Sequence, residues 1–152
     1  MNKFFAIICL YGLTISCTNN AYFEDNKEIL NQSWDYNQQP DFTVKIEDNK
    51  SKYDLYVNIR HTNQYDYSNL YILLHEKGKS IRDTSYRKEI KLAELDGKWT
   101  GKSSGTLYET QFLAKSNITF PDTGLYTFAI EQNMRINPLL EINDVGIKLV
   151  KK

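Results

Sequence analysis

Cysteine is almost absent from this sequence. The chain of 152 residues has only Cys9 and Cys17, and both lie close to its N-terminus. The remainder of the chain therefore has no thiol for a disulfide, for a thiolate-bound metal ion or for a cysteine nucleophile. A domain formed by that remainder must be held together by its hydrophobic core.

An excess of charge of either sign is also absent. The chain has 19 Lys and Arg residues and 19 Asp and Glu residues, which gives a formal net charge of zero. No overall positive field is available to attract nucleic acid, so we expect no nucleic-acid partner.

The sequence also lacks the residue patterns of enzymes and metal proteins. Its two histidines, His61 and His75, have no second ligand at a spacing typical of metal sites. No serine lies in a G-x-S-x-G turn, and the chain has no P-loop and no G-x-G-x-x-G motif. We therefore predict a non-enzymatic protein without a metal ion or a cofactor.

Long apolar runs are limited to the N-terminus. Lys3 precedes an apolar segment, residues 4–13, that is too short to span a bilayer core of about 30 Å as a helix. Small and β-branched residues then precede Cys17, as they do at the cleavage site of bacterial lipoproteins. The pattern predicts a lipoprotein signal peptide at 1–16 and lipidation of Cys17. The alternative is an ordinary secretory signal with an incidental cysteine.

The segment that follows is polar and of mixed charge. Residues 17–31 contain few apolar side chains, which is typical of a flexible connection between a membrane anchor and a folded domain. We therefore predict an acylated N-terminus and a flexible tether at 17–31, and one folded domain at 32–152.

The rest of the chain has the periodicity of a β-protein. Apolar and polar residues alternate at 42–46, 53–59, 126–130 and 145–149, and period two places the apolar set on one face of a strand. The continuous apolar run at 70–74 predicts a strand that is buried on both faces. Further strands are predicted at 107–113 and 118–120, and 90–95 is ambiguous.

Short strands separated by turn residues indicate an all-β fold, a single-domain antiparallel β-sandwich of the immunoglobulin or jelly-roll kind. The D-x-G-x-Y pattern that ends at Tyr126 predicts a tyrosine corner within this fold.

Two segments are candidates for a binding surface. Residues 60–69 connect two predicted strands and carry Arg, His, Asn and two Tyr without an aliphatic residue, which suits a polar binding loop. The alternative is that the tyrosine rings of this loop pack back on the sheet. Trp99 follows a predicted turn and is either a partner anchor or a plug on the end of the sandwich, of which we prefer the plug.

Four stretches together resemble one known family. They are RHTNQYDYSNLYI, LDGKWTGKSSGTLYE, GLYTFAIEQNMR and LLEINDVGIKL, in that order along the chain. The sequence resembles the gliding-motility lipoprotein GldH family of the Bacteroidota. It departs from the family pattern at Glu141, where a small residue is expected. The candidate interaction or structural residues are Arg60, Asn63, Tyr65, Tyr67, Asn69, Trp99, Glu131, Gln132, Met134, Arg135 and Asp144.

The resemblance implies a lipid-anchored cell-envelope protein, accessory to gliding motility and to the associated protein secretion machinery. Its partners would be a membrane, through the N-terminal lipid, and other envelope proteins. In the phylum of this family, acidic residues close to the acylated cysteine favour export to the cell surface. Glu24 and Asp25 lie farther along the chain from Cys17, which favours the periplasmic face, and we expect an outer-membrane position. The alternative function is a carbohydrate-binding lipoprotein that stacks Tyr and Trp rings on sugars.

We also expect ion pairs among these candidates. Arg60 and Arg135 are each expected to pair with Glu131 or Asp144 inside the sandwich, where breaking a buried pair costs several kcal/mol. A contact with a partner is the alternative role for the same residues.

Overall fold

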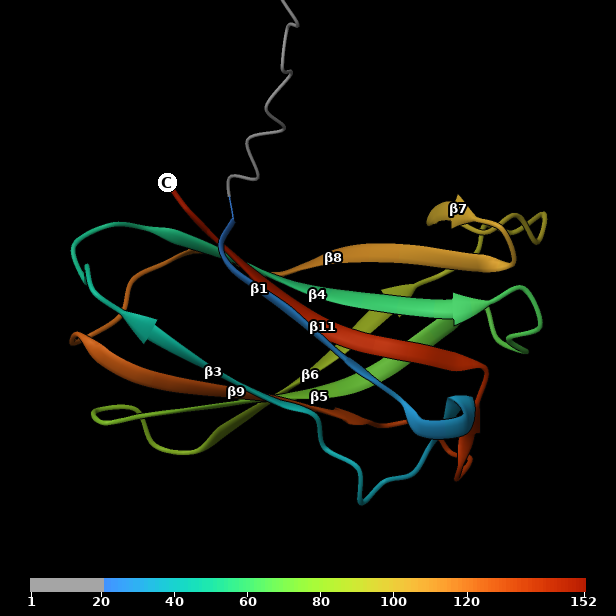
Figure 1. The fold of residues 1–152 in the computed structure, drawn as a ribbon, viewed down its shortest axis with the longest axis horizontal. Helices are drawn as coiled ribbons and strands as arrows, with labels where there is room; N and C mark the ends of the chain where they lie inside the picture. Colours follow the sequence, from blue (N-terminus) through green and yellow to red (C-terminus); the bar gives the residue numbers. More distant parts are fainter. Residues whose placement is uncertain (1–20) are drawn as a thin grey trace, which may run out of the picture.

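The structure, a computed structural model, describes residues 21–152, and it consists of β-strands with one short 3-10 helix, η1 (Figure 1). No helix within this range is long and apolar enough to cross a membrane. The elements are β1 (Ala21–Glu28), η1 (Leu30–Gln32), β2 (Ser33–Trp34), β3 (Asp41–Ile46), β4 (Tyr53–Thr62), β5 (Asn69–Gly78), β6 (Thr84–Lys91), β7 (Lys102–Ser104), β8 (Leu107–Ile118), β9 (Gly124–Gln132), β10 (Leu139–Leu140) and β11 (Ile142–Lys151).

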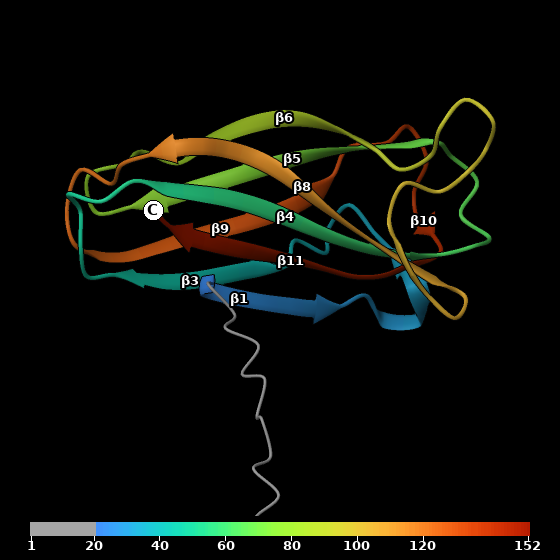
Figure 2. The same ribbon diagram turned by 90° about the horizontal axis from the view of Figure 1, so that it is seen from above.

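The strands form two antiparallel sheets that pack face to face (Figures 1 and 2). The five-stranded sheet has the order β1-β11-β4-β8-β7, and the four-stranded sheet has the order β3-β9-β5-β6. The short pair β10-β2 lies at one end of the sandwich. The predicted antiparallel β-sandwich is confirmed.

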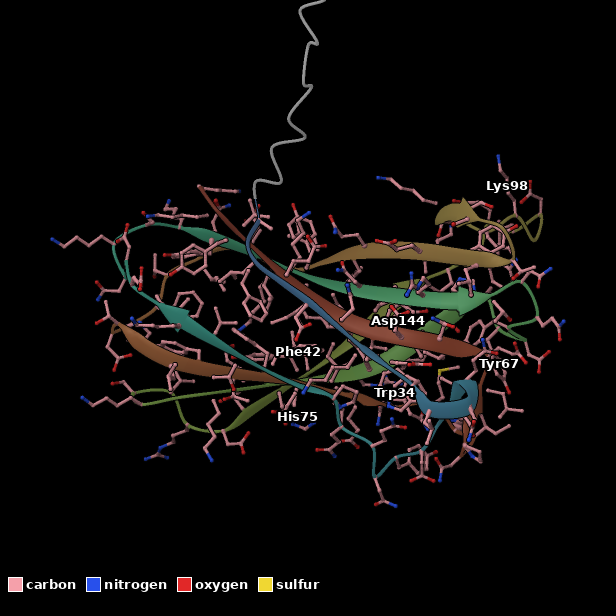
Figure 3. All side chains as sticks on the ribbon, in the orientation of Figure 1. Trp34, Phe42, Tyr67, His75, Lys98 and Asp144 are labelled. Atoms are coloured by element: carbon pink, nitrogen blue, oxygen red, sulfur yellow. The ribbon has the colours of Figure 1, made fainter. Side chains whose placement is uncertain are left out.

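The core lies between the two sheets and follows from the alternation seen in the sequence. Phe42 of β3 is the cross-strand partner of Phe128 of β9, and both side chains are fully buried. Trp34 is buried at the end of the core, where its indole N–H donates to the backbone oxygen of Gln38 at 2.7 Å (Figure 3). Each such side chain contributes about 1.5–3 kcal/mol through burial, which offsets the absence of disulfides.

The prediction that residues 70–74 are buried on both faces is wrong. Leu70, Ile72 and Leu74 of β5 are buried between the sheets, whereas Tyr71 and Leu73 lie half-buried on the outer face. Among residues 21–152 no further layer lies outside the four-stranded sheet, so an apolar run here means a partly exposed apolar surface.

The predicted flexible tether is also wrong where the structure describes it. Residues 21–28 form β1, an edge strand that pairs antiparallel with β11 from Ala21 opposite Val150 to Glu28 opposite Asp144. An edge strand is held by backbone hydrogen bonds on one side and needs little apolar alternation, so composition did not reveal it. The signal peptide and Cys17 lie outside the described residues.

The tyrosine corner is confirmed. The Tyr126 hydroxyl donates to the backbone oxygen of Asp122 at 3.1 Å and also bonds the Asp122 carboxylate. Burial, together with this carboxylate, raises the pKa of Tyr126 to about 12. Ser80 donates to the same carboxylate at 2.7 Å, so the corner connects the turn before β9 with the turn between β5 and β6.

Two segments with less regular patterns, residues 107–120 and 90–95, are strands only in part. The strand predicted at 107–113 extends to Ile118 as β8, whose pairing with β4 is irregular around Leu55, whereas the strand predicted at 118–120 is wrong beyond Ile118. Phe120 follows this strand and is buried in the core. In the ambiguous segment 90–95, Leu92 is buried but Leu95 is fully exposed, so only its first part is core.

Candidate functional site

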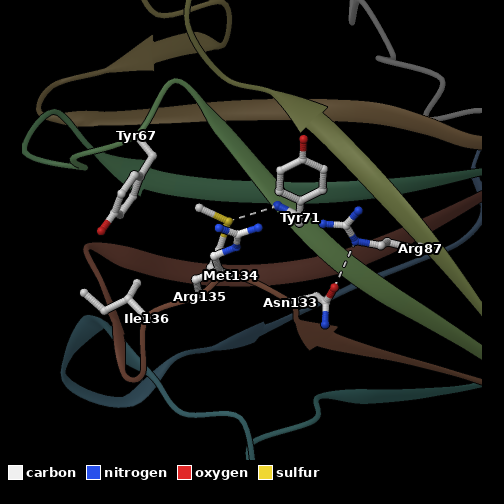
Figure 4. A pocket seen from close by; sticks show the side chains of 7 residues that line it. All are labelled: Tyr67, Tyr71, Arg87, Asn133, Met134, Arg135 and Ile136. Atoms are coloured by element: carbon white, nitrogen blue, oxygen red, sulfur yellow. Dashed lines mark hydrogen bonds between the residues drawn. The ribbon is translucent and has the colours of Figure 1, made fainter.

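A groove lies at the end of the sandwich where β9 ends and β5 begins (Figure 4). Its volume is about 530 Å³, within the range of ligand-binding clefts in proteins. We call it the arginine groove. It is lined by Tyr67, Tyr71, Arg87, Asn133, Met134, Arg135 and Ile136.

The buried side chain of Gln132 shapes the loop that forms one wall of the arginine groove. Its Oε1 accepts a hydrogen bond from the backbone N–H of Met134 at 2.9 Å, and its Nε2 donates to the backbone oxygen of Ile136 at 3.1 Å. The backbone N–H of Asn133 donates to the backbone oxygen of Tyr71 at 2.7 Å. These bonds turn the chain after β9 across the start of β5, so Gln132 positions the groove without lining it.

The floor of the groove is apolar and well supported. The backbone N–H of Tyr71 donates to the sulfur of Met134 at 3.3 Å, and the Tyr36 hydroxyl donates to the backbone oxygen of Met134 at 2.7 Å. The ring of Tyr67 packs edge-on against buried Tyr65 with centroids 5.6 Å apart. Ile136 remains 46% exposed, which leaves it available to a bound group.

Two guanidinium groups make the groove electropositive. Arg87 lies over the ring of Tyr71, 4.1 Å from its centroid, and its Nε donates to Asn133 at 3.0 Å. Figure 4 shows Arg135 between Tyr67 and Tyr71. Within residues 21–152 neither arginine forms an ion pair, and no acidic residue is among the groove-lining side chains.

The carboxylates nearest along these strands are occupied by other groups. Glu89 accepts from Asn69 at 2.7 Å, and its hydrogen bond with Tyr71 raises the pKa of that tyrosine. Glu131 accepts from Gln39 at 2.8 Å and pairs with His75 at 3.0 Å. Both carboxylates therefore already have hydrogen-bond partners. Glu131 lies on the outer face of the four-stranded sheet beside the groove, and Asn69 holds Glu89 near the groove.

The polar loop predicted at 60–69 is shorter than expected. Strand β4 continues to Thr62 and β5 begins at Asn69, so only residues 63–68 connect them. Asn63 is exposed, and its backbone N–H donates to Thr106 at 2.9 Å. Tyr65 is buried and its hydroxyl donates to the backbone oxygen of Asn69 at 3.1 Å. The ring of Tyr65 therefore packs back on the sheet, which is the alternative to a polar binding loop.

Trp99 closes the same end of the sandwich. Its ring meets buried His61 edge-on with centroids 4.6 Å apart, and Tyr108 and Tyr65 complete the aromatic cluster. The position corresponds to the preferred interpretation of Trp99 as a plug. The Nδ1 of His61 bonds the backbone oxygen of Thr62 at 2.8 Å, whereas Nε2 has no partner among the described residues. Burial lowers the pKa of His61.

The predicted ion pair of Arg60 with Asp144 exists, but its predicted location inside the sandwich is wrong. The Nε of Arg60 lies 2.6 Å from Oδ2 of Asp144 on the outer face of the five-stranded sheet. Alternation along β4 turns Ile59 and His61 inward and Arg60 outward, so its side chain is 43% exposed. Arg135 has neither of its predicted partners.

The structure thus brings three of the predicted candidates, Tyr67, Met134 and Arg135, into one groove and places the others around it or on the opposite sheet. Sequence reasoning missed Tyr71 and Arg87. Tyr71 was hidden in a run read as buried, and Arg87 lies on β6, a polar edge strand with little alternation. Asn133 lies between the predicted candidates Gln132 and Met134, and this position could have identified it from the sequence.

The described carboxylates do not gather into a metal site. Within residues 21–152 no three His, Cys, Asp or Glu side chains lie close enough to hold a metal ion. Carboxylates in the turns serve the backbone: Asp96 accepts from the N–H of Lys98 at 3.0 Å, and Asp48 accepts from that of Lys50 at 2.8 Å. The fold and the groove together define the class, a β-sandwich domain with an electropositive groove at one end.

Comparison with known proteins places the chain in a family. Residues 21–149 match the GldH lipoprotein family, and the chain belongs to it. It is 31% identical to the gliding motility lipoprotein GldH homolog of Christiangramia forsetii, over 97% of this chain and 94% of that protein. It is 26% identical to the gliding motility lipoprotein GldH of Flavobacterium johnsoniae, over 92% of this chain and 91% of that protein.

A solved structure of an arabinose-bound α-L-arabinofuranosidase also aligns with this chain, with a TM-score of 0.38 and 10% identity. The alignment covers 83% of this chain and 19% of that one. A likeness of this size supports no conclusion about function.

Proposed function

We propose that this protein is a lipid-anchored, non-enzymatic component of the cell envelope, accessory to gliding motility and to the associated secretion machinery. The observation that carries the proposal is its membership in the GldH lipoprotein family over almost the whole described domain. Two relatives with gliding-motility names, each aligned over more than nine-tenths of its length, support it.

The anchor in this proposal is lipid on Cys17, with the domain on the periplasmic side of the outer membrane. A single acyl chain gives only reversible membrane binding. Diacylglycerol and an N-terminal acyl chain together provide more than one chain, which is enough for stable anchoring. Only residues 18–20 separate Cys17 from β1, a reach of roughly 10 Å. Strand β1 then runs toward the end of the sandwich that holds the arginine groove, so the groove would face away from the membrane and toward other envelope proteins.

The carbohydrate-binding alternative is less well supported by the geometry. Stacking on a sugar requires an open aromatic face, but Arg87 covers Tyr71 and the ring of Trp99 packs on His61. Tyr67 alone among the predicted stacking residues lines the groove.

Deletion of the gene in its native host tests the proposed function. We expect loss of colony spreading, or of proteins released to the medium, with restoration by the wild-type chain. The matched variant Cys17→Ala, expressed to the same level, should fail to restore either. Unchanged spreading and an unchanged set of released proteins in the deletion strain would refute the proposal.

A further inference from the structure

The arginine groove combines an apolar floor with two arginines that form no ion pair within residues 21–152. Of the four arginines in the chain, Arg60 is paired with Asp144 and Arg82 is exposed between β5 and β6. The other two, Arg87 and Arg135, line this groove. Two cations at one site, in a chain whose formal charges balance, repel each other, so an anion bound between them would stabilise the pair.

The arginines differ in how they are held. Arg87 is fixed by its position over Tyr71 and by its bond to Asn133, which leaves the terminal nitrogens of its guanidinium for a ligand. Arg135 is exposed, and its backbone belongs to the loop that Gln132 orders. A planar guanidinium of this kind suits bidentate binding of a carboxylate.

The apolar part of the groove requires more than a small anion. Met134, Tyr67 and the exposed side chain of Ile136 present apolar surface beside the two charges. A flexible thioether beside aromatic rings adapts to different apolar side chains. The ligand therefore needs carboxylates and an aliphatic or aromatic side chain within a few residues of one another, which is the chemistry of an acidic peptide segment.

We infer that the arginine groove binds an acidic, partly apolar peptide segment of another envelope protein. Carboxylates of the segment would bind Arg87 and Arg135, and an apolar side chain between them would pack on Met134 and Ile136. The inference rests on the proposed function, because it identifies the kind of partner that an accessory envelope protein would hold at its free end.

A peptide selection tests the inference directly. The lipidated full-length protein, purified in detergent, is offered a phage library of random twelve-residue peptides, with counter-selection on the Arg87→Gln/Arg135→Gln variant. We expect enriched sequences that place Asp or Glu beside Leu, Ile, Met or Phe. Synthetic peptides of these sequences should bind each single variant about tenfold more weakly than wild type, since each loses one charge-assisted contact.

The controls separate the groove from general charge. Arg82→Gln removes an equally exposed arginine outside the groove and should leave binding unchanged. Ile136→Ala should weaken binding several-fold without changing the salt dependence, whereas Arg135→Gln should reduce that dependence. Arg135→Gln and Arg82→Gln change exposed side chains, so their thermal unfolding should match wild type. Arg87→Gln also loses its contacts with Tyr71 and Asn133, so circular dichroism at the binding temperature should show that this variant remains folded.

Three outcomes of the peptide experiments would overturn the inference. They are selection of neutral or basic peptides, equal binding of acidic peptides to the double variant, and no enrichment over the counter-selection. Binding of an acidic glycan that depends on both arginines, with no peptide enriched, would also overturn it. A failed selection beside a clear deletion phenotype would leave the proposed function standing, whereas peptide binding without any deletion phenotype would refute that function alone.

Discussion

Gly146 is the residue at which the pairing of β1 with β11 can be tested most directly. It lies opposite Asn26 in the register of the two strands. A Cβ atom at Gly146 would lie 2.6 Å from Cγ of Asn26 and even closer to the backbone oxygen of Asp25. Gly146→Ala therefore forces β1 away from β11, because one of the two obstacles is backbone and no rotamer removes it.

The size of the effect follows from the distances. Ordinary contact between nonbonded carbons begins near 3.5 Å, so β1 must retreat by roughly 1 Å. That movement takes the two nearest ladder hydrogen bonds beyond bonding distance, at a net cost of about 1 kcal/mol each. We expect a loss of about 2 kcal/mol, within the range for overpacked sites.

Urea denaturation followed by circular dichroism measures this loss. With a slope of about 2 kcal/mol per molar urea, the midpoint should fall by about 1 M. Hydrogen exchange should show loss of protection in β1 before the rest of the five-stranded sheet. Asn26→Ala in the Gly146→Ala background removes only the side-chain obstacle, so it should recover less than half of the loss. A wild-type midpoint with protected β1 amides in Gly146→Ala would refute the reasoning.

Three further predictions concern the core and the pairs described above. Tyr126→Phe removes the hydrogen bonds of the tyrosine corner and should lower the free energy of unfolding by about 1 kcal/mol in urea titrations; an unchanged value would show that the corner contributes only packing. A double-mutant cycle of Arg60→Gln and Asp144→Asn should give a coupling of at most about 1 kcal/mol, because Arg60 is half-exposed; a coupling of several kcal/mol would contradict the outer-face position. Because burial lowers the pKa of His61 below its usual 6.5, the unfolded chain takes up this proton first, so wild-type stability should fall as the pH decreases below 6.5. The fall should continue until the pH passes the folded pKa. His61→Phe should remove this part of the decrease between pH 7.5 and 5.5, measured by urea titration at each pH; an identical decrease in both proteins would argue against it.

The strands with alternating apolar residues were predictable, because a buried face imposes period two on the sequence. Strands β3, β4, β9 and β11 were found in this way. Strand β1 was not predicted in this way. It is held by backbone hydrogen bonds to β11 and by the space that Gly146 leaves beside it, and neither produces a periodic pattern in the sequence. Local hydrogen-bonding motifs such as the tyrosine corner were readable because they lie within a few residues of one another.

The groove was predictable only in part. Tyr67, Met134 and Arg135 were singled out from motifs, but their proximity depends on how β9 ends over β5. Arg87 comes from an edge strand with no motif and enters the groove through its stacking on Tyr71. The wrong location predicted for the Arg60 pair has the same cause. The sequence indicates which charged residues are present, but which of them form a pair depends on the face of the sheet on which each side chain lies.

The antiparallel pairing of β1 with β11 also determines how the domain would carry mechanical load. A pull on the chain at Ala21, resisted at the groove end of the sandwich, acts nearly along the axis of β1. The hydrogen bonds between Ala21 and Glu28 would then be sheared together rather than opened one after another. If the proposed lipid anchor holds one end of the domain and the proposed partner holds the other, this strand is the element that bears the tension.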